Sequence, residues 1–86
     1  MPVISVFFGI VIRMFYQEHV PPHFHAEHQG QQASFDFTGK VLAGRIESRT
    51  ALRLIRQWAG LHEPELARNW TMMMAGRPLE RIPPLE

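Results

Sequence analysis

Histidine is the residue type in this chain whose spacing most directly suggests chemistry. Four of the five histidines fall between positions 19 and 28, and two of them flank a phenylalanine in His23-Phe24-His25. In a β-strand, this spacing places both imidazoles on one face, about 6.5–7 Å apart at their Cα atoms, so that both can reach one metal ion. Glu27 extends the row, and His23, His25 and Glu27 form a candidate metal site. Two histidines and one carboxylate suit a divalent cation such as zinc, manganese or iron(II).

The same segment permits catalysis without a metal. A histidine beside an aspartate is oriented by it and becomes more basic, which suits general acid–base chemistry such as cleavage of an RNA backbone. His23, His25 and Asp36 are the candidate catalytic residues on this interpretation. A third interpretation is that these residues are only the polar side of a half-solvated antiparallel strand, which alternates in the same way.

Arginine is the residue type that would bind a phosphate or an acidic partner. Arg49, Arg53 and Arg56 fall at helical spacing, so they line one side of a predicted helix. The five candidate binding residues are Arg13, Arg45, Arg49, Arg53 and Arg56. Nine basic residues against eight acidic ones give a net charge of +1, which does not favour nucleic acid as the partner.

Length and composition limit the class of protein. The 86 residues fit one domain, and 45% hydrophobic content excludes a disordered chain. The chain has no cysteine, which excludes disulfide frameworks, thiolate zinc sites and thiol catalysis. The apolar segment 3–12 is about half the length that spans a bilayer, so we interpret it as a buried strand and expect a cytoplasmic protein with no membrane association.

Hydrophobic alternation predicts the strands that position these residues. We expect strands over residues 8–16, 23–28 and 32–37 and a short one over 41–46. In the first strand, Phe8, Ile10, Ile12, Met14 and Tyr16 share one face, and Gly9, Val11, Arg13 and Phe15 share the other.

A hairpin turn at residues 29–31 should join the second and third strands. Gly30 can take the positive φ of a two-residue turn either after Gln29 or before Gln31. Both registers place His23 and His25 on the face opposite Phe24. The first register sets Asp36 opposite His23, and the second sets it opposite His25.

Two helices should follow the strands. Ser48 is a suitable N-cap for a helix that begins at residue 49 and ends at Gly60, and Pro64 fits the first turn of a second helix that ends at Gly76. The expected apolar stripes are Ala51, Leu54, Ile55, Trp58 and Ala59 in the first helix, and Leu66, Ala67, Trp70, Met73 and Met74 in the second. We expect residues 77–86 to be extended and to pack on their own domain or on a partner's sheet edge.

These elements predict an α+β fold, in which a three- or four-stranded antiparallel sheet is followed by two helices packed on one face. We expect one domain over residues 1–86, with a β-rich part at 1–46, the two helices at 47–76 and an extended proline-rich tail at 77–86. The predicted core residues are Phe24, Phe35, Phe37, Leu54, Ile55, Trp58, Leu66 and Trp70.

The sequence also resembles a known family. The residues that carry the resemblance are Pro21-Pro22-His23-Phe24-His25-Ala26 above all, together with residues 9–15, 18–20, 39–44, 51–54, Trp58, 69–70 and 76–79. They are similar to the opening and later motifs of a bacterial family known as domain of unknown function 4160. Val20 and His28 depart from the family pattern, which usually has a polar residue and an aromatic residue there.

The resemblance implies a small cytoplasmic bacterial protein, often encoded beside a second small domain in an arrangement that looks like a toxin–antitoxin pair. One hypothesis is therefore an interaction module that binds a small protein encoded nearby or a second copy of itself. The alternative is a small metal-assisted or histidine-based ribonuclease or phosphodiesterase that uses the His23, His25 and Asp36 face. Whether the protein is an enzyme stays open at this point.

Overall fold

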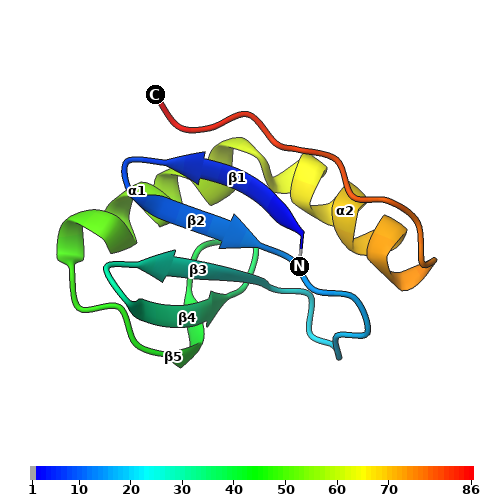
Figure 1. Ribbon diagram of the computed structural model, residues 1–86, viewed down its shortest axis with the longest axis horizontal. Helices are drawn as coiled ribbons and strands as arrows, with labels where there is room; N and C mark the ends of the chain where they lie inside the picture. The colour runs from blue at the N-terminus through cyan, green and yellow to red at the C-terminus, as the bar shows by residue number, and fades with distance from the viewer. Residues whose placement is uncertain (1) are drawn as a thin grey trace.

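The computed structural model describes residues 2–86, which fold into one sheet and two helices (Figure 1). The elements in chain order are β1 (Val3–Phe7), β2 (Ile10–Arg13), β3 (Phe24–His28), β4 (Gln31–Phe35), β5 (Val41–Gly44), α1 (Arg49–Leu61) and α2 (Glu63–Met74). The sheet is an antiparallel meander in the order β1-β2-β3-β4-β5, so the fold is α+β as predicted. The prediction of three or four strands is wrong, because there are five.

The additional strand arises from a hairpin that the sequence analysis misses. Phe8 and Gly9 both have positive φ, 49° and 76°, and form the two-residue turn between β1 and β2. Turns of this kind favour asparagine, aspartate or glycine at the first position, so Phe8 gives no turn signal. The predicted faces are nevertheless correct for residues 10–14, since Ile10, Ile12 and Met14 are buried.

The hairpin of β3 and β4 has the register in which Gln29 and Gly30 form the turn, which is the first of the two predicted. Gln29 and Gly30 have φ of 48° and 79°, and His28 is paired with Gln31. This register pairs Phe24 with Phe35, whose rings stack with centroids 5.4 Å apart. The strand registers therefore place the apolar faces of β2, β3 and β4 on the same side of the sheet.

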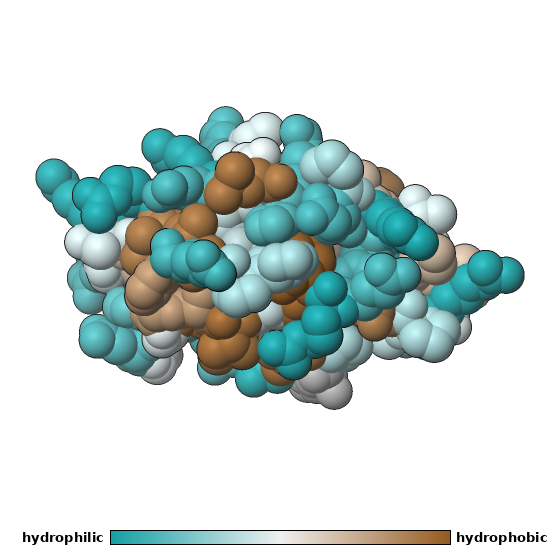
Figure 2. Space-filling view, turned by 90° about the horizontal axis from the view of Figure 1, so that it is seen from above, coloured by the Kyte–Doolittle hydropathy of each residue, from teal (hydrophilic) through white to brown (hydrophobic). Residues whose placement is uncertain are grey.

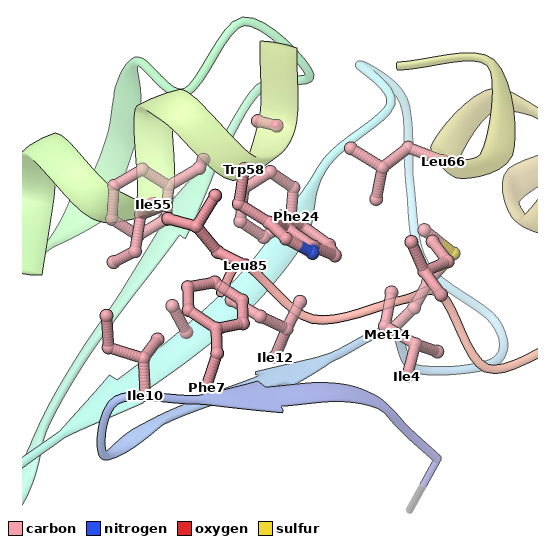
Figure 3. Packing of buried hydrophobic residues seen from close by; sticks show 14 of the residues in the cluster. Ile4, Phe7, Ile10, Ile12, Met14, Phe24, Ile55, Trp58, Leu66 and Leu85 are labelled. Carbon is pink, nitrogen blue, oxygen red and sulfur yellow. The ribbon is translucent and has the colours of Figure 1, made fainter. Parts of the chain in front are cut away.

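In Figure 1, α1 lies behind the sheet on this apolar side, and α2 continues past the end of the strands, where its Trp70 contacts the rings of His23 and Phe37. Trp58 of α1 is fully buried and contacts the rings of Phe7 and Phe24, and Leu66 of α2 closes the other end of the core (Figure 3). Six of the predicted core residues are buried, whereas Phe37 and Leu54 are only partly buried and pack against the core.

The helix boundaries agree with the predicted caps. The Oγ atom of Ser48 accepts a hydrogen bond from the N–H of Ala51 at 3.1 Å, and α1 ends at Leu61, one residue beyond Gly60. The buried stripe of α2 is Leu66, Asn69, Trp70 and Met73. The prediction is therefore wrong for Ala67 and Met74, which are exposed, and it omits Asn69.

The tail explains the burial of Asn69. The side-chain amide of Asn69 donates to the carbonyl of Glu80 at 2.8 Å, and its oxygen accepts from the N–H of Glu80 at 3.0 Å. The N–H of Ile82 donates to the carbonyl of Ile4 on β1 at 2.7 Å, and Trp58 Nε1 donates to the carbonyl of Pro83 at 2.9 Å. The tail thus packs on its own chain, which is one of the two predicted alternatives.

The surface that carries the tail is mixed in character. Figure 2 views the molecule from above Figure 1 and shows hydrophobic side chains separated by hydrophilic ones. Within residues 2–86, neither helix has the length and apolar composition that crossing a membrane requires.

Candidate metal centre

Strand β3 places two of the clustered histidines where the alternation predicts them. Phe24 and Ala26 of β3 are buried in the core, whereas His25 and Glu27 lie on the opposite, open face of the sheet. His23 directly precedes the strand, and its ring lies beside that of His25, with centroids 5.1 Å apart and planes at 71°. The prediction that the two imidazoles lie side by side, away from Phe24, is confirmed.

The carboxylate that joins them is Glu18, from the loop between β2 and β3. His25 Nε2 donates to Glu18 Oε1 at 2.7 Å, and His23 Nε2 lies 3.5 Å from Glu18 Oε2. Gln17, with φ of 64°, turns the chain immediately before Glu18, and Pro21-Pro22 return it to the start of β3. All three side chains are partly buried, with exposed fractions of 12% for His23, 23% for Glu18 and 32% for His25.

The tautomer of His23 is fixed by Nδ1, the ring nitrogen that does not face Glu18. His23 Nδ1 lies 2.7 Å from the carbonyl oxygen of Pro21. Because a carbonyl oxygen can only accept, Nδ1 must carry the proton and donate it. In the neutral ring, Nε2 then presents a lone pair toward Glu18. A metal-binding histidine commonly donates its second nitrogen to a backbone carbonyl in this way.

Aromatic residues on two elements hold the imidazole rings in place. The ring of His23 packs against Trp70 of α2, with centroids 5.4 Å apart. The ring of Phe15 meets that of His25 edge to face at 4.6 Å. These contacts limit the rotation of both histidines and leave their Nε2 atoms pointing toward the same carboxylate.

The spacing of the three ligand atoms fits one metal ion. One oxygen of Glu18 and one nitrogen each of His23 and His25 all lie within 4.8 Å of one another. With metal–nitrogen bonds of about 2.0–2.1 Å, ligand atoms in a tetrahedral zinc site are about 3.3 Å apart. The two nitrogen–oxygen distances from Glu18 to His25 and His23, 2.7 and 3.5 Å, lie on either side of that value. A two-histidine, one-carboxylate set leaves a coordination position for water or substrate.

Glu27, the carboxylate of the predicted metal set, has another partner in the structure. Its Oε1 accepts from Arg13 Nε on the adjacent strand at 2.8 Å. Glu27 follows the histidines on the open face as predicted, but the structure brings Glu18 rather than Glu27 to the imidazole nitrogens.

Asp36, the predicted catalytic carboxylate, lies in the turn after β4. Its Oδ1 accepts from the N–H and hydroxyl of Thr38 and from the N–H of Lys40, at 2.6–3.0 Å. Partial burial of Asp36 opposes its ionisation, but these hydrogen bonds outweigh it and hold the pKa of the carboxyl below its ordinary value. In the described residues, Asp36 stabilises a turn and makes no ion pair with a histidine.

The other three histidines are not part of the cluster. His62 lies between the two helices, where its Nδ1 donates to Glu65 Oε2 at 2.7 Å and so lowers the pKa of Glu65. His19 is exposed in the loop, and His28 lies at the far end of β3. The structure therefore selects two of the five histidines for the candidate site.

The structure also separates the candidate arginines. Arg13 lies on the open face of the sheet, opposite His25 in the register of β2 and β3. Arg45 follows β5 and pairs with Glu47 at 3.0 Å, with its side chain 79% exposed. The three arginines of α1 are exposed on a helix that covers the other face of the sheet. Only Arg13 lies near the histidines.

Several hollows adjoin the cluster, and two of them bear on access to it. One, of about 310 Å³, lies over the open face and is lined by His25, Arg13, Glu27 and Phe15 among others. The other, of about 440 Å³, has Glu18 and His23 in its wall, with otherwise mostly apolar surroundings that include Leu42 of β5. A metal held by the three ligands would therefore be accessible from the surface.

Glu18 is the site residue that the sequence analysis misses. It belongs to no strand, so neither the alternation nor the strand pairing points to it. The available signal is its position in residues 18–20, which share the family resemblance and directly precede its most specific segment, residues 21–26. A ten-residue loop can return a side chain to a strand in many ways, so only the tertiary structure identifies the contact.

Comparison with known proteins yields a family and no characterised relative. A family model described as Domain of unknown function (DUF4160) matches residues 9–71, a span that includes Arg13, Glu18, His23, His25 and Glu27. In the comparisons with curated proteins and with solved structures, nothing matches the chain.

Proposed function

Since the chain belongs to the DUF4160 family, whose name assigns no activity, we propose a function from the geometry of the site: the protein binds a divalent transition metal through Glu18, His23 and His25 and hydrolyses phosphodiesters with it. Zinc, manganese and iron(II) all accept this ligand set. The proposal replaces Asp36 with Glu18 in the enzymatic hypothesis drawn from the sequence.

The observation that carries the proposal is the orientation of His23. Its Nδ1 donates to the Pro21 carbonyl, so the lone pair of Nε2 faces Glu18 Oε2 at 3.5 Å. Two electron-rich atoms oriented toward each other repel unless a cation lies between them. A metal ion between them binds Glu18, His23 and His25 together, whereas a proton on His23 Nε2 would give a charged hydrogen bond to Glu18; the zinc titration distinguishes the two.

The residues have distinct roles in this proposal. Glu18, His23 and His25 hold the metal, and Trp70 and Phe15 restrict the imidazole rings. When bound, the metal supplies a water molecule of lowered pKa, so that hydroxide is available near neutral pH. In the hydrolysis, the water oxygen bonds to phosphorus, one ester P–O bond breaks, and the displaced alkoxide takes up a proton from water.

Calorimetric titration with zinc and manganese tests the metal site. We expect one ion per chain in the wild type, and binding weakened at least about tenfold in Glu18→Ala and His25→Ala. The matched control is His28→Ala, which removes a histidine from the same strand but outside the cluster, and it should bind as the wild type does. Equal metal binding by His25→Ala and the wild type would overturn the proposal.

Hydrolysis of bis(p-nitrophenyl) phosphate tests the activity. We expect turnover in the metal-loaded protein that a chelator abolishes and His25→Ala lacks. Turnover that survives the chelator but is lost in His25→Ala would replace the metal with histidine-based acid–base catalysis. A metal-loaded protein without turnover would contradict the hydrolytic part of the proposal.

A second candidate function is supported by the free edge of the sheet. All four residues of β5 are exposed, with Val41 at 40% and Leu42 at 44%, whereas the β1 edge is covered by the tail. An unpaired edge strand can accept an extended segment of another protein. This favours an interaction module, one half of a toxin–antitoxin-like pair, that binds a small protein encoded nearby in the bacterial cytoplasm.

Co-purification from the native operon tests this second candidate. We expect the neighbouring protein to accompany a tagged copy of this chain, and Leu42→Lys on β5 to abolish the association. Recovery of the tagged protein alone, as a monomer beside its genetic neighbour, would contradict it. The matched control is Leu61→Lys, which places the same charge at an exposed leucine of α1, distant from the edge.

A further inference from the structure

We propose that the hollow over the open face of the sheet is a phosphate subsite, in which Arg13 binds the phosphate group of the substrate and Glu27 is the positioning residue that holds Arg13 in place. This inference rests on the proposed function, since it names the substrate group presented to the metal site. It also selects one of the five arginines predicted to bind.

The first argument is the register of β2 and β3. Arg13 and His25 are directly opposite each other on adjacent antiparallel strands. Residues in such a pair have Cβ atoms about 4.5–5.5 Å apart and their side chains on the same face. The guanidinium therefore lies beside a candidate metal ligand, so one phosphate group can contact both.

The second argument is the free hydrogen-bonding capacity of Arg13. Its Nε donates to Glu27 Oε1 at 2.8 Å, and no other side-chain hydrogen bond of Arg13 occurs within residues 2–86. The two terminal nitrogens remain available on a side chain that is 29% exposed. They can donate in parallel to two phosphate oxygens, which is the geometry that distinguishes arginine from lysine.

The third argument is the shape and lining of the hollow. Its volume of about 310 Å³ is at the lower end of the range for small-molecule sites, so it fits a phosphate ester rather than a duplex. Val11 and Phe15 provide an apolar wall for the ester group, and Gln32 provides a polar one. This lining suits a phosphate that carries a flat or apolar substituent.

The fourth argument is the balance of charge around His25. Without a metal, the carboxylates of Glu18 and Glu27 outnumber the single guanidinium of Arg13, so the site repels anions. With a divalent cation bound, the local charge becomes positive and attracts a phosphate. Binding of phosphate should therefore require the metal, which ties the subsite to the cluster and not to the general surface charge.

Titration of phenyl phosphate into the zinc-loaded protein tests the subsite. We expect binding by the wild type and at least about tenfold weaker binding by Arg13→Gln, with zinc affinity within about twofold of the wild type. Arg13→Lys should lose several-fold, since lysine keeps the charge but not the paired donors. The matched control is Arg53→Gln on α1, which should bind phenyl phosphate as the wild type does.

Variants of Glu27 test the positioning role. Glu27→Ala should weaken phenyl phosphate binding several-fold, and Glu27→Gln should restore much of it because an amide oxygen still accepts from Arg13 Nε. A purely structural role would not give this rescue. Equal binding of benzoate and phenyl phosphate would contradict selection for phosphate, because benzoate presents a carboxylate on the same ring.

The outcomes separate this inference from the proposed function. Failure of the wild type to bind zinc would overturn both. Zinc binding with phenyl phosphate affinity unchanged in Arg13→Gln and Arg13→Lys would overturn only the subsite. Circular dichroism of each variant checks that the fold is retained. If Arg13→Gln fails to fold, Arg13→Lys still tests the subsite, because lysine keeps the ion pair with Glu27.

Discussion

Glu18 Oε1 lies 2.7 Å from Nε2 of His25, and this contact fastens the loop between β2 and β3 to the open face of the sheet. The second oxygen of the same carboxylate lies 3.5 Å from Nε2 of His23. One side chain from an irregular segment thus brings together two imidazoles that the strand alternation has already aligned. The site is consequently sensitive to changes in the loop as well as in β3.

Metal binding should stabilise the folded protein. A ligand that binds only the folded state stabilises it by about 2.7 kcal/mol at a hundredfold excess over the dissociation constant, which for a chain of this size raises the melting temperature by roughly 10 °C or more. Thermal denaturation with and without zinc measures the shift, and Glu18→Ala should remove it. Glu47→Ala, which deletes an exposed carboxylate that is not part of the cluster, should leave it unchanged. The same shift in Glu18→Ala would contradict the site.

Metal affinity should fall in acid. A protonated imidazole has no lone pair to coordinate, so protons compete with the metal below about pH 6, and each histidine ligand contributes up to about tenfold per pH unit. Zinc titrations at pH 7.5, 6.5 and 5.5 measure this slope. An affinity that does not change across this range would show that the metal binds through carboxylates alone.

Asp36 should stabilise the turn between β4 and β5. Asp36→Ala removes the acceptor of three hydrogen bonds, and we expect a loss of about 1–2 kcal/mol in urea denaturation, with a smaller loss for Asp36→Asn, which keeps one oxygen. Because the pKa of Asp36 is lowered in the folded state, its contribution is complete above the ordinary aspartate pKa and disappears as the pH falls through the lowered value. The difference between the wild type and Asp36→Ala should therefore shrink in strong acid. A difference that grows in acid would contradict this assignment.

Asn69 should hold the tail against α2. Asn69→Leu keeps the volume but leaves the N–H and carbonyl of Glu80 without their partner, so we expect a loss of about 2–3 kcal/mol. Amide hydrogen exchange should accelerate at Glu80 and Ile82 before it does in β2 and β3. Thr71→Ala, on the exposed side of the same helix, is the control and should leave the exchange of the tail unchanged. Uniform acceleration across the sheet would argue that Asn69 acts on global stability alone.

Gly39 should tolerate no side chain. Its φ is +89°, and a Cβ built there would lie 2.6 Å from the Cα of Arg56, so α1 or the turn must move. We expect Gly39→Ala to cost more than about 2 kcal/mol in urea denaturation. Gly60→Ala is the matched control, because Gly60 lies within α1 with nothing within 4 Å of the added atom, and alanine there should stabilise by about 0.5–1 kcal/mol. Equal effects of the two substitutions would contradict the close packing of α1 on this turn.

Much of the fold follows from local patterns in the sequence. Alternation assigns Phe24 and Ala26 to the core and His25 to the open face, since a strand has a strict period of two and one face must be buried. Ser48 identifies the start of α1 because its side chain satisfies a free N–H of the first turn. These assignments depend on neighbours in the sequence, and the structure confirms them.

The errors occur where a local preference is overridden by distant contacts. Phe8 takes a left-handed turn conformation because the apolar faces of β1 and β2 must both meet the core, so one predicted strand becomes a hairpin. Asn69 replaces Ala67 in the buried stripe because the tail, eleven residues away, satisfies its amide. Neither partner can be identified from the residues near Phe8 or Asn69.

In the candidate site, too, local sequence predicts some of the residues and distant contacts decide the others. The sequence by itself determined that His23 and His25 would lie side by side on the non-core face, because strand geometry fixes their spacing. Only the tertiary structure decided that Glu18 joins them while Asp36 binds its own turn and Glu27 binds Arg13. The physical reason is that a carboxylate binds the hydrogen-bond donors that lie near it. For a loop residue, the path of the backbone decides which donors are near, and the residue's position in the sequence does not.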